Sequence, residues 1–193
     1  MTDGVRLDIA RNRRSVRYSR RENIQRLLWG VGQLLFRAVP RPLYGIRSAI
    51  LRLFGARIGP HCQIYPTVRV FLPSQLEVGA WTAIGDGANV YNLGPIRIGE
   101  RVTISQGVHL CAGTHDYTDP AMPLIRAEIS IEDSAWLCAE AFVGPGVVVG
   151  RRAVVGARGV AVRSVEPEAV VGGNPARVIK SRTPPVRAGD AER

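Results

Sequence analysis

The chain has 193 residues, which is enough for one domain with a substantial hydrophobic core, and its composition is that of an ordinary globular protein. That composition excludes a disordered chain and a collagen-like fibre. The net charge of +10 is unevenly placed: residues 1–57 contain 13 arginines and three acidic residues, whereas residues 58–193 contain 13 residues of each sign. Because the basic excess is confined to the N-terminal part, it does not indicate a nucleic-acid-binding domain.

The cysteines Cys62, Cys111 and Cys138 are odd in number and show no CxxC spacing. This pattern is not that of a disulfide framework and favours a reducing compartment, with the cysteines as small buried core residues. No apolar run approaches the roughly 20 residues of a membrane-spanning helix. Charged residues also stand where a signal peptide has its apolar region. We therefore expect a cytoplasmic protein.

Residues 1–18 are predicted to form a basic, flexible arm exposed to solvent. The residues that carry its charge include Arg11, Arg13, Arg14 and Arg17. Whether this arm binds a partner or only solubilises the chain stays open at this stage.

Residues 19–55 are predicted to form two amphipathic helices. Ser19 and Glu22 have the spacing of a capping box, and a helical periodicity predicts a first helix over residues 19–39. Two prolines follow, and a second helix is predicted over residues 43–55, where a glycine caps its C-terminus. The apolar positions of the first helix are Ile24, Leu27, Leu28, Val31, Leu34 and Leu35.

The apolar faces of both helices are accompanied by arginines and by Trp29. A basic amphipathic helix with a tryptophan at the interface is typical of a segment that lies on a membrane surface. The alternative is that the helices cap the end of the domain that follows, with their apolar faces buried. The sequence leaves both interpretations open. The arginines are Arg26, Arg37, Arg41, Arg47 and Arg52.

From Ile58 onward, aliphatic residues recur every six residues and glycine often follows them. The fifth position of each unit is small or β-branched, and two positions that keep phase over many units make a hexapeptide repeat. The leading residues are Ile58, Ile64, Val70, Val78, Ile84, Val90, Ile98, Ile104, Leu110, Ile131, Leu137, Val143, Val149, Val155 and Ala161. The fifth residues are Cys62, Val68, Thr82, Ala88, Val102, Val108, Ala135, Ala141, Val147 and Ala153.

This repeat predicts a parallel β-helix. Each unit is a short strand and a corner, and three units make one triangular coil of about 18 residues. The leading and fifth residues point inward, while glycine relieves the backbone near the turn. We expect this mainly β domain to span residues 56–182, followed by a tail at residues 183–193.

Residues 111–128 interrupt the repeat. A long insertion without repeat character, in a domain of short turns, is typical of a functional loop. Its centre is the run Thr114-His115-Asp116-Tyr117. The sequence therefore predicts the functional site at this loop.

Several runs together resemble the hexapeptide-repeat O-acetyltransferases, and in particular the branch of colanic acid and exopolysaccharide biosynthesis, which is related to maltose and galactoside acetyltransferases. The resemblance covers about residues 50–182 and rests on the repeat, the THDY loop and the closing GGNPARVIK. It implies a left-handed parallel β-helix, acetyl-CoA as co-substrate, and a homotrimer whose active sites lie between neighbouring subunits.

The chemistry implied by the resemblance needs one base. A neutral imidazole can take the proton of a sugar hydroxyl as that hydroxyl attacks the thioester carbonyl, and can then pass it to the leaving thiolate. The resemblance places this role on His115. Asp116 either orients the imidazole or caps a turn, and His61 and His109 are expected to face outward.

The resemblance also implies contacts with the acceptor and with CoA. Cationic side chains are suited to the phosphates of CoA. The expected acceptor-side residues are Asn92, Asp116, Tyr117, Trp136 and Glu128, the last of which would support His115. The expected CoA-side residues are Cys138, Ala139, Gly156, Ala157, Arg158, Arg163, Arg177 and Lys180.

Three other functions stay open. An N-acetyltransferase acting on an amino sugar or a xenobiotic would also use His115. A metal lyase similar to the γ-class carbonic anhydrases would need all three histidines to converge on a metal, and His61 stands far from the others in the chain; no metal is expected. A non-catalytic scaffold held at an anionic membrane is the third.

Overall fold

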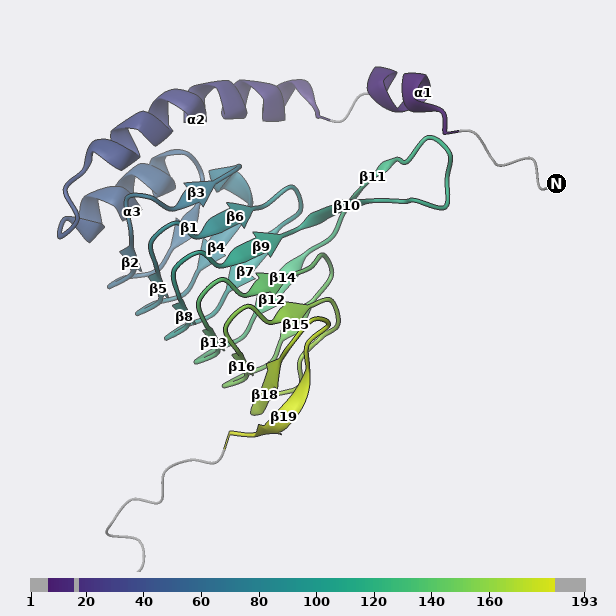
Figure 1. Cartoon of the computed structure of the whole chain (residues 1–193). Helices are drawn as coiled ribbons and strands as arrows, with labels where there is room; N and C mark the ends of the chain where they lie inside the picture. Colours follow the sequence, from purple (N-terminus) through teal and green to yellow (C-terminus); the bar gives the residue numbers. More distant parts are fainter. Residues whose placement is uncertain (1–6, 16–17, 183–193) are drawn as a thin grey trace, which may run out of the picture.

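The structure is a computed structural model that describes residues 7–15 and 18–182. A stack of parallel coils forms the body of the molecule, with helices α2 (Arg20–Ala38) and α3 (Tyr44–Leu53) at one end and strand β19 (Arg177–Ser181) at the other (Figure 1). Helix α1 (Ile9–Arg14) lies away from this stack, beside a projecting hairpin (Figure 1). The predicted mainly β fold with N-terminal helices is confirmed.

Three parallel sheets form the walls of the β-helix, and each coil contributes one short strand to each wall. The first sheet contains β1 (Arg57–Ile58), β4 (Leu76–Val78), β7 (Ile96–Ile98), β12 (Ile129–Ile131) and β15 (Val148–Val149). The second contains β2 (Gln63–Ile64), β5 (Ala83–Ile84), β8 (Thr103–Ile104), β13 (Trp136–Leu137), β16 (Val154–Val155) and β18 (Ala169–Gly172), closed by the antiparallel β19. The third contains β3 (Arg69–Val70), β6 (Asn89–Tyr91), β9 (His109–Cys111), β14 (Phe142–Val143) and β17 (Val160–Ala161), and a 3-10 turn, η1 (Pro73–Gln75), precedes β4.

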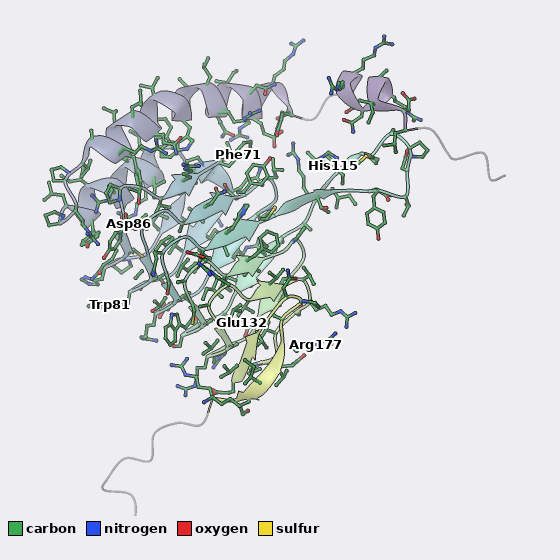
Figure 2. All side chains as sticks on the ribbon, viewed as in Figure 1. Phe71, Trp81, Asp86, His115, Glu132 and Arg177 are labelled. Carbon is green, nitrogen blue, oxygen red and sulfur yellow. The ribbon has the colours of Figure 1, made fainter. Side chains whose placement is uncertain are left out.

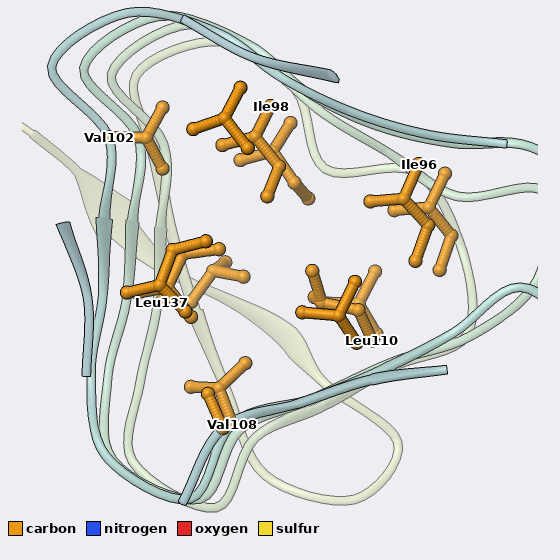
Figure 3. Packing of buried hydrophobic residues seen from close by; sticks show 14 of the residues in the cluster. Ile96, Ile98, Val102, Val108, Leu110 and Leu137 are labelled. Carbon is orange, nitrogen blue, oxygen red and sulfur yellow. The ribbon is translucent and has the colours of Figure 1, made fainter. Parts of the chain in front are cut away.

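The core is a ladder of aliphatic side chains. Every leading and fifth residue of the predicted repeat is buried. Register stacks them in columns: Ile84 pairs with Ile104, which pairs with Leu137. Figure 3 shows Ile98, Leu110 and Leu137 pointing into the same interior from three walls. Full burial of one such side chain contributes about 1.5–3 kcal/mol, so the stacked coils stabilise one another.

Glycine is required at the first corner of the coils because successive coils approach closely there. A Cβ atom on Gly79 would lie 2.5 Å from the carbonyl carbon of Gly99 in the next coil. On Gly59 it would lie 2.6 Å from the backbone nitrogen of Ala80. No side chain fits at such distances, so at these positions glycine is needed for the close approach of the next coil and not for an unusual φ.

Helix α2 caps the open end of the β-helix. The predicted capping box is present: Glu22 N donates to Ser19 Oγ at 3.2 Å, and Ser19 N donates to Glu22 Oε2 at 2.7 Å. Trp29 is buried, and its Nε1 donates to the carbonyl of Val70 at 2.7 Å. Of the two interpretations left open, burial of Trp29 is therefore the one that the structure supports, because the first coil offers the indole an apolar surface and the carbonyl of Val70.

Helix α3 contributes a buried arginine, which the sequence placed beside the apolar faces of the helices. Arg47 is fully buried, and its Nε donates to the carbonyl of Ile64 at 2.6 Å. Its other nitrogens donate to the carbonyls of Val39 at 3.1 Å, Pro40 at 2.8 Å and Arg41 at 2.5 Å. Burial lowers the pKa of Arg47. The guanidinium thus joins the edge of the β-helix to the link between the two helices.

The cysteines follow the prediction in part. Cys62 is buried, whereas Cys111 and Cys138 are half-buried, and all three are free thiols. Burial raises the pKa of both Cys62 and Cys138. Over residues 7–15 and 18–182, no helix combines the length and the apolar character needed to cross a bilayer.

The basic N-terminal arm differs from the prediction where the structure describes it. Asp8 caps α1 by accepting a hydrogen bond from Arg11 N at 2.9 Å, and the chain from Asp8 to Asn12 contacts the hairpin. The charge pattern could not indicate these contacts because they join residues more than 100 positions apart. Residues 1–6, 16 and 17 of the arm, and the tail at 183–193, lie outside the described residues.

Candidate functional site

The predicted insertion is a β-hairpin that leaves the wall of the β-helix. After β9, the chain forms β10 (Gly113–His115), turns, and returns as the antiparallel β11 (Leu124–Arg126) before rejoining the wall at β12. The two ends of the excursion are joined, because Ala127 N donates to the carbonyl of Ala112 at 3.2 Å. Figure 2 shows His115 on this hairpin, away from the stacked coils.

The imidazole of His115 has one nitrogen fixed by the backbone. Its Nδ1 lies 2.7 Å from the carbonyl oxygen of Met122. Because a carbonyl only accepts, Nδ1 must carry the hydrogen, which in the neutral ring leaves the lone pair on Nε2. The side chain is half-buried. The carbonyl of Met122 therefore sets the tautomer of the neutral ring.

Asp116 caps a turn, so it is not the group that orients the imidazole. Its Oδ1 accepts from Thr118 Oγ1 at 2.6 Å and from Thr118 N at 2.9 Å. These two hydrogen bonds, the side-chain one first, lower the pKa of Asp116. The orienting role belongs to the carbonyl of Met122, which the sequence did not single out. The next residue, Tyr117, is 84% exposed.

Glu128 and Asn92 each have partners other than His115. Glu128 forms an ion pair with Arg97. Asn92 is fully buried, and its Oδ1 accepts from the backbone nitrogens of Phe71 at 3.1 Å and Leu72 at 3.0 Å. Its Nδ2 donates to the carbonyl of Leu72 at 2.6 Å. That Asn92 contacts an acceptor stays a prediction, and in this structure its amide holds a corner of the coil.

Trp136 lies on the outer face of the second sheet. It is 45% exposed, and its Nε1 donates to Ser105 Oγ at 3.0 Å. The indole is therefore held against the neighbouring coil with one side open to solvent.

The residues expected to bind CoA through their backbone gather at one corner in two successive coils. Cys138 N donates to the carbonyl of Val155 at 2.8 Å, and Arg158 N donates to the carbonyl of Ala139 at 2.9 Å. Gly156 and Ala157 continue this corner in the second of the two coils. The side chain of Arg158 is paired with Glu140 at 2.6 Å.

Two of the expected cationic residues meet near the C-terminal end of the β-helix. Arg163 and Arg177 line the same hollow of about 250 Å³. Lys180 is exposed further along β19. The structure thus brings Arg163 and Arg177 together, although 14 positions separate them in the chain.

The three histidines lie in three different surroundings. His61 is stacked on Trp81 with ring centroids 4.1 Å apart. His109 packs edge-on against Phe142, and its Nε2 lies 3.3 Å from Asn89 Nδ2. Burial lowers the pKa of His109. Within the described part of the chain, no group of three His, Cys, Asp or Glu side chains is placed to hold a metal ion.

The sequence did not indicate that Asn89, His109 and Phe142 are neighbours on the third sheet. These residues are register partners in adjacent coils of the third sheet. The 20-residue step from Asn89 to His109 carries the chain once around the β-helix, and this spacing was the available signal for that pair.

Comparison with known proteins assigns the family. The chain is 40% identical over 156 residues to WcaF of Escherichia coli (strain K12), which is named as a colanic acid biosynthesis acetyltransferase, and the match covers 81% of this chain and 86% of that protein. A hexapeptide-repeat acetyltransferase from Vibrio cholerae superposes with a TM-score of 0.79 at 27% identity, covering 86% and 95% of the two chains. The chain belongs to the hexapeptide-repeat acetyltransferases. It is therefore an acyltransferase, as the sequence predicted.

Other solved members of the hexapeptide-repeat acetyltransferases share the architecture. The Vibrio cholerae protein has also been solved with acetyl coenzyme A, at a TM-score of 0.78 and 26% identity, with 86% and 91% of the chains covered. A galactoside acetyltransferase in complex with coenzyme A has the same fold, with a TM-score of 0.79 at 20% identity over 86% and 84% of the chains. No profile of a protein family matches the chain.

Proposed function

We propose that this protein transfers the acetyl group of acetyl-CoA to a hydroxyl of a sugar used in exopolysaccharide or other cell-surface polysaccharide biosynthesis. The observation that carries the proposal is the hydrogen bond between His115 Nδ1 and the carbonyl of Met122, which leaves Nε2 as the basic nitrogen. The relative WcaF supports the substrate class by its name, and the complex of the Vibrio cholerae protein supports the donor.

In the proposed reaction, Nε2 of His115 takes the proton of the acceptor hydroxyl while the hydroxyl oxygen attacks the thioester carbonyl. The tetrahedral intermediate then collapses, the carbon–sulfur bond breaks, and the thiolate of CoA receives the proton from Nε2. The products are an acetyl ester and free CoA, and no acetyl group is attached to the protein. Throughout this cycle Nδ1 keeps its hydrogen and its bond to Met122.

The proposed CoA site uses the corner at residues 138–139 and 156–158 together with Arg163, Arg177 and Lys180. Arginine is suited to this role because its guanidinium can bind a phosphate through two hydrogen bonds. The corner offers backbone groups, and the hollow between Arg163 and Arg177 offers positive charge. Trp136 has an exposed edge beside this corner, where it would contact the acceptor or the pantetheine arm.

We further propose a homotrimer. His115 lies on the hairpin that projects sideways from the stack between β9 and β12, whereas Arg177 lies at the C-terminal end of the stack (Figure 2). A neighbouring copy that brings its own wall to the hairpin would join base and CoA site. The mass of the protein in solution tests this, and a monomer that retains full activity would contradict it.

The activity is tested by measuring CoA release from acetyl-CoA with a panel of free, nucleotide-linked and lipid-linked sugars. His115→Ala should lower kcat by about 10²- to 10⁴-fold, the usual contribution of a positioned base. His61→Ala is the matched control, because His61 is exposed and stacks on Trp81, which lies away from the hairpin (Figure 2). A His115→Ala protein that keeps full turnover would overturn the proposal. Products formed only with amino sugars would indicate N-acetylation instead.

The outer face of α2 supports a peripheral contact with an anionic membrane on its cytoplasmic side. Trp29 and Phe36 point into the β-helix, and the opposite face of the helix is apolar and exposed, with Leu27 at 77% and Leu34 at 69%. Leu28 lines a hollow together with Leu53 of α3, so the apolar surface continues from one helix to the other.

The charge of α2 complements such a surface. The helix carries Arg20, Arg21, Arg26 and Arg37 against a single acidic residue, Glu22. Each arginine near an anionic bilayer contributes roughly 1 kcal/mol of attraction, and the apolar face adds the free energy of burial. We therefore propose that this face holds the enzyme at the membrane, where a lipid-linked acceptor would be found.

Point variants test this contact better than deletion, because removing α2 would uncover the end of the core. The full chain should sediment with phosphatidylglycerol vesicles and not with phosphatidylcholine vesicles. Leu27→Asp combined with Leu34→Asp should weaken binding at least about ten-fold. Ile179→Asp, at a similarly exposed position on the other end of the molecule, should not. Unchanged vesicle binding by the double variant would contradict the proposal. So would a wild type that does not bind vesicles, together with a double variant of altered oligomeric mass, because the apolar face would then be a contact between copies of the chain.

A further inference from the structure

We propose that Asn12 is a positioning residue for His115, acting through the carbonyl group of Met122. The role of His115 as base rests on the function proposed above, whereas the control of its imidazole by Asn12 does not. The proposal gives the N-terminal helix α1 a part in the proposed active site.

Helix α1 is bound to the tip of the hairpin by three backbone carbonyls. Asn12 Nδ2 donates to the carbonyls of Ala121 at 2.6 Å and Met122 at 2.7 Å. The backbone nitrogen of Asp8 donates to the carbonyl of Pro120 at 2.8 Å. Three consecutive carbonyls of the turn therefore accept hydrogen bonds from the N-terminal segment, by which we mean residues 7–15 and 18–22.

The carbonyl oxygen of Met122 is shared between Asn12 and His115. It accepts from Asn12 Nδ2 and from His115 Nδ1, each at 2.7 Å. A carbonyl oxygen has two lone pairs, so the two donors can be accommodated together. Any shift of this oxygen away from Asn12 would also change the hydrogen bond that fixes the tautomer of His115.

The backbone at Met122 adopts an uncommon conformation. Its φ is +45°, in the left-handed region that few residues with a side chain occupy. Within the turn, Met122 N donates to the carbonyl of Asp119 at 2.8 Å, and Ala121 N donates to Asp119 Oδ1 at 2.7 Å. Asn12 adds the contacts that come from outside the hairpin.

A second tether holds the returning strand of the hairpin. Glu22, in the first turn of α2, forms an ion pair with Arg126 of β11. The ring of Tyr18 lies under the same guanidinium, 5.1 Å from its carbon. The hairpin is thus held by the N-terminal segment near its tip and near its base, which limits its motion relative to the wall.

The first test reads the tautomer of His115 directly and needs no substrate. The chain contains three histidines, so nitrogen NMR of the ring atoms can follow each of them, with His115→Ala giving the assignment. In the wild type, His115 should carry hydrogen on Nδ1 only. In Asn12→Ala, the signals should shift toward a mixture of both tautomers. The signals of His61 and His109 should not change.

Three variants separate the hydrogen bonds from the mere presence of the side chain. Asn12→Ala removes both donors. Asn12→Asp keeps the shape of the side chain but places carboxylate oxygens against the carbonyls of Ala121 and Met122. Because these oxygens repel each other, Asn12→Asp should change the signals of His115 more than Asn12→Ala does. Asn23→Ala is the matched control, because Asn23 is exposed and its side chain makes no hydrogen bond to another described residue. Melting temperatures of all three identify any variant that fails to fold.

The second test is kinetic. Asn12→Ala should lower kcat about ten- to a hundred-fold with little change of KM for acetyl-CoA, because a base is displaced while the CoA site is untouched. Identical His115 signals in Asn12→Ala and Asn23→Ala would overturn the positioning role. Changed signals with full activity in His115→Ala would keep the positioning role and overturn the proposed function instead.

Discussion

The wall of the β-helix and the hairpin that leaves it are stabilised in different ways. In the wall, every coil repeats the same contacts, so Ile84, Ile104 and Leu137 occupy equivalent places and each coil supports the next. In the hairpin, single contacts from distant parts of the chain hold the structure, such as Asn12 on Met122 and Glu22 on Arg126. The comparison teaches that the repeat builds the fold, while the candidate chemistry depends on contacts that occur once.

The junction between wall and helices should show the largest effect on stability. Arg47→Met would leave the carbonyls of Ile64 and of the link between α2 and α3 without their donor, at a cost of about 3–5 kcal/mol. Denaturant unfolding monitored by tryptophan fluorescence measures this. Arg37→Met, on the exposed side of α2, should change the free energy of unfolding by less than about 0.5 kcal/mol. Equal effects of the two variants would show that the buried guanidinium is dispensable.

A glycine of the wall should resist replacement, whereas a glycine of helix α2 should accept it. Gly79→Ala would place a Cβ 2.5 Å from backbone atoms of the next coil and should destabilise the protein by about 2–3 kcal/mol. Gly30→Ala lies in a helix with open space around it and should stabilise the protein by about 0.5–1 kcal/mol. Thermal unfolding of both variants gives the comparison, and a harmless Gly79→Ala would mean that the coils can separate locally.

The ion pair between Glu22 and Arg126 at the hairpin should show the smallest effect on stability, and this effect should depend on pH. The hydrogen bond from the backbone of Ser19, helped by Arg126, lowers the pKa of Glu22 below its ordinary value of 4.5. The folded pKa is thus below the unfolded one, so the stabilisation is present above pH 4.5 and is lost as the pH falls through the folded value.

Glu22→Gln isolates this charge, because glutamine can still accept the hydrogen bond of the capping box. The variant should lose about 1 kcal/mol at pH 7, and its melting temperature should approach that of the wild type in acid. Glu100→Gln, at an exposed corner, should have the melting temperature of the wild type both at pH 7 and in acid. A constant difference between Glu22→Gln and the wild type down to pH 3 would exclude the ion pair as its cause.

Much of the fold follows from the sequence because the repeat is local. The phase of the aliphatic residues fixed which side chains are buried, from Ile58 to Ala161, and the spacing of Ser19 and Glu22 fixed the start of α2. The interruption at residues 111–128 likewise placed the hairpin.

The contacts that the sequence did not indicate are long-range or involve the backbone. The partner of His115 is a carbonyl, which every residue possesses, so no residue type marks it. Amphipathic periodicity shows that a face is apolar and not what covers it, so it left open whether Trp29 and Arg47 are buried. The contact of Asn12 with the hairpin spans 110 positions and follows no period.

The hairpin is closed at its base by the hydrogen bond between Ala127 and Ala112. Because this bond joins the two ends of the excursion, the coils on either side are connected independently of the residues beyond it. We therefore expect that the segment from Gly113 to Arg126 can be replaced by one of different length while the coils keep their register.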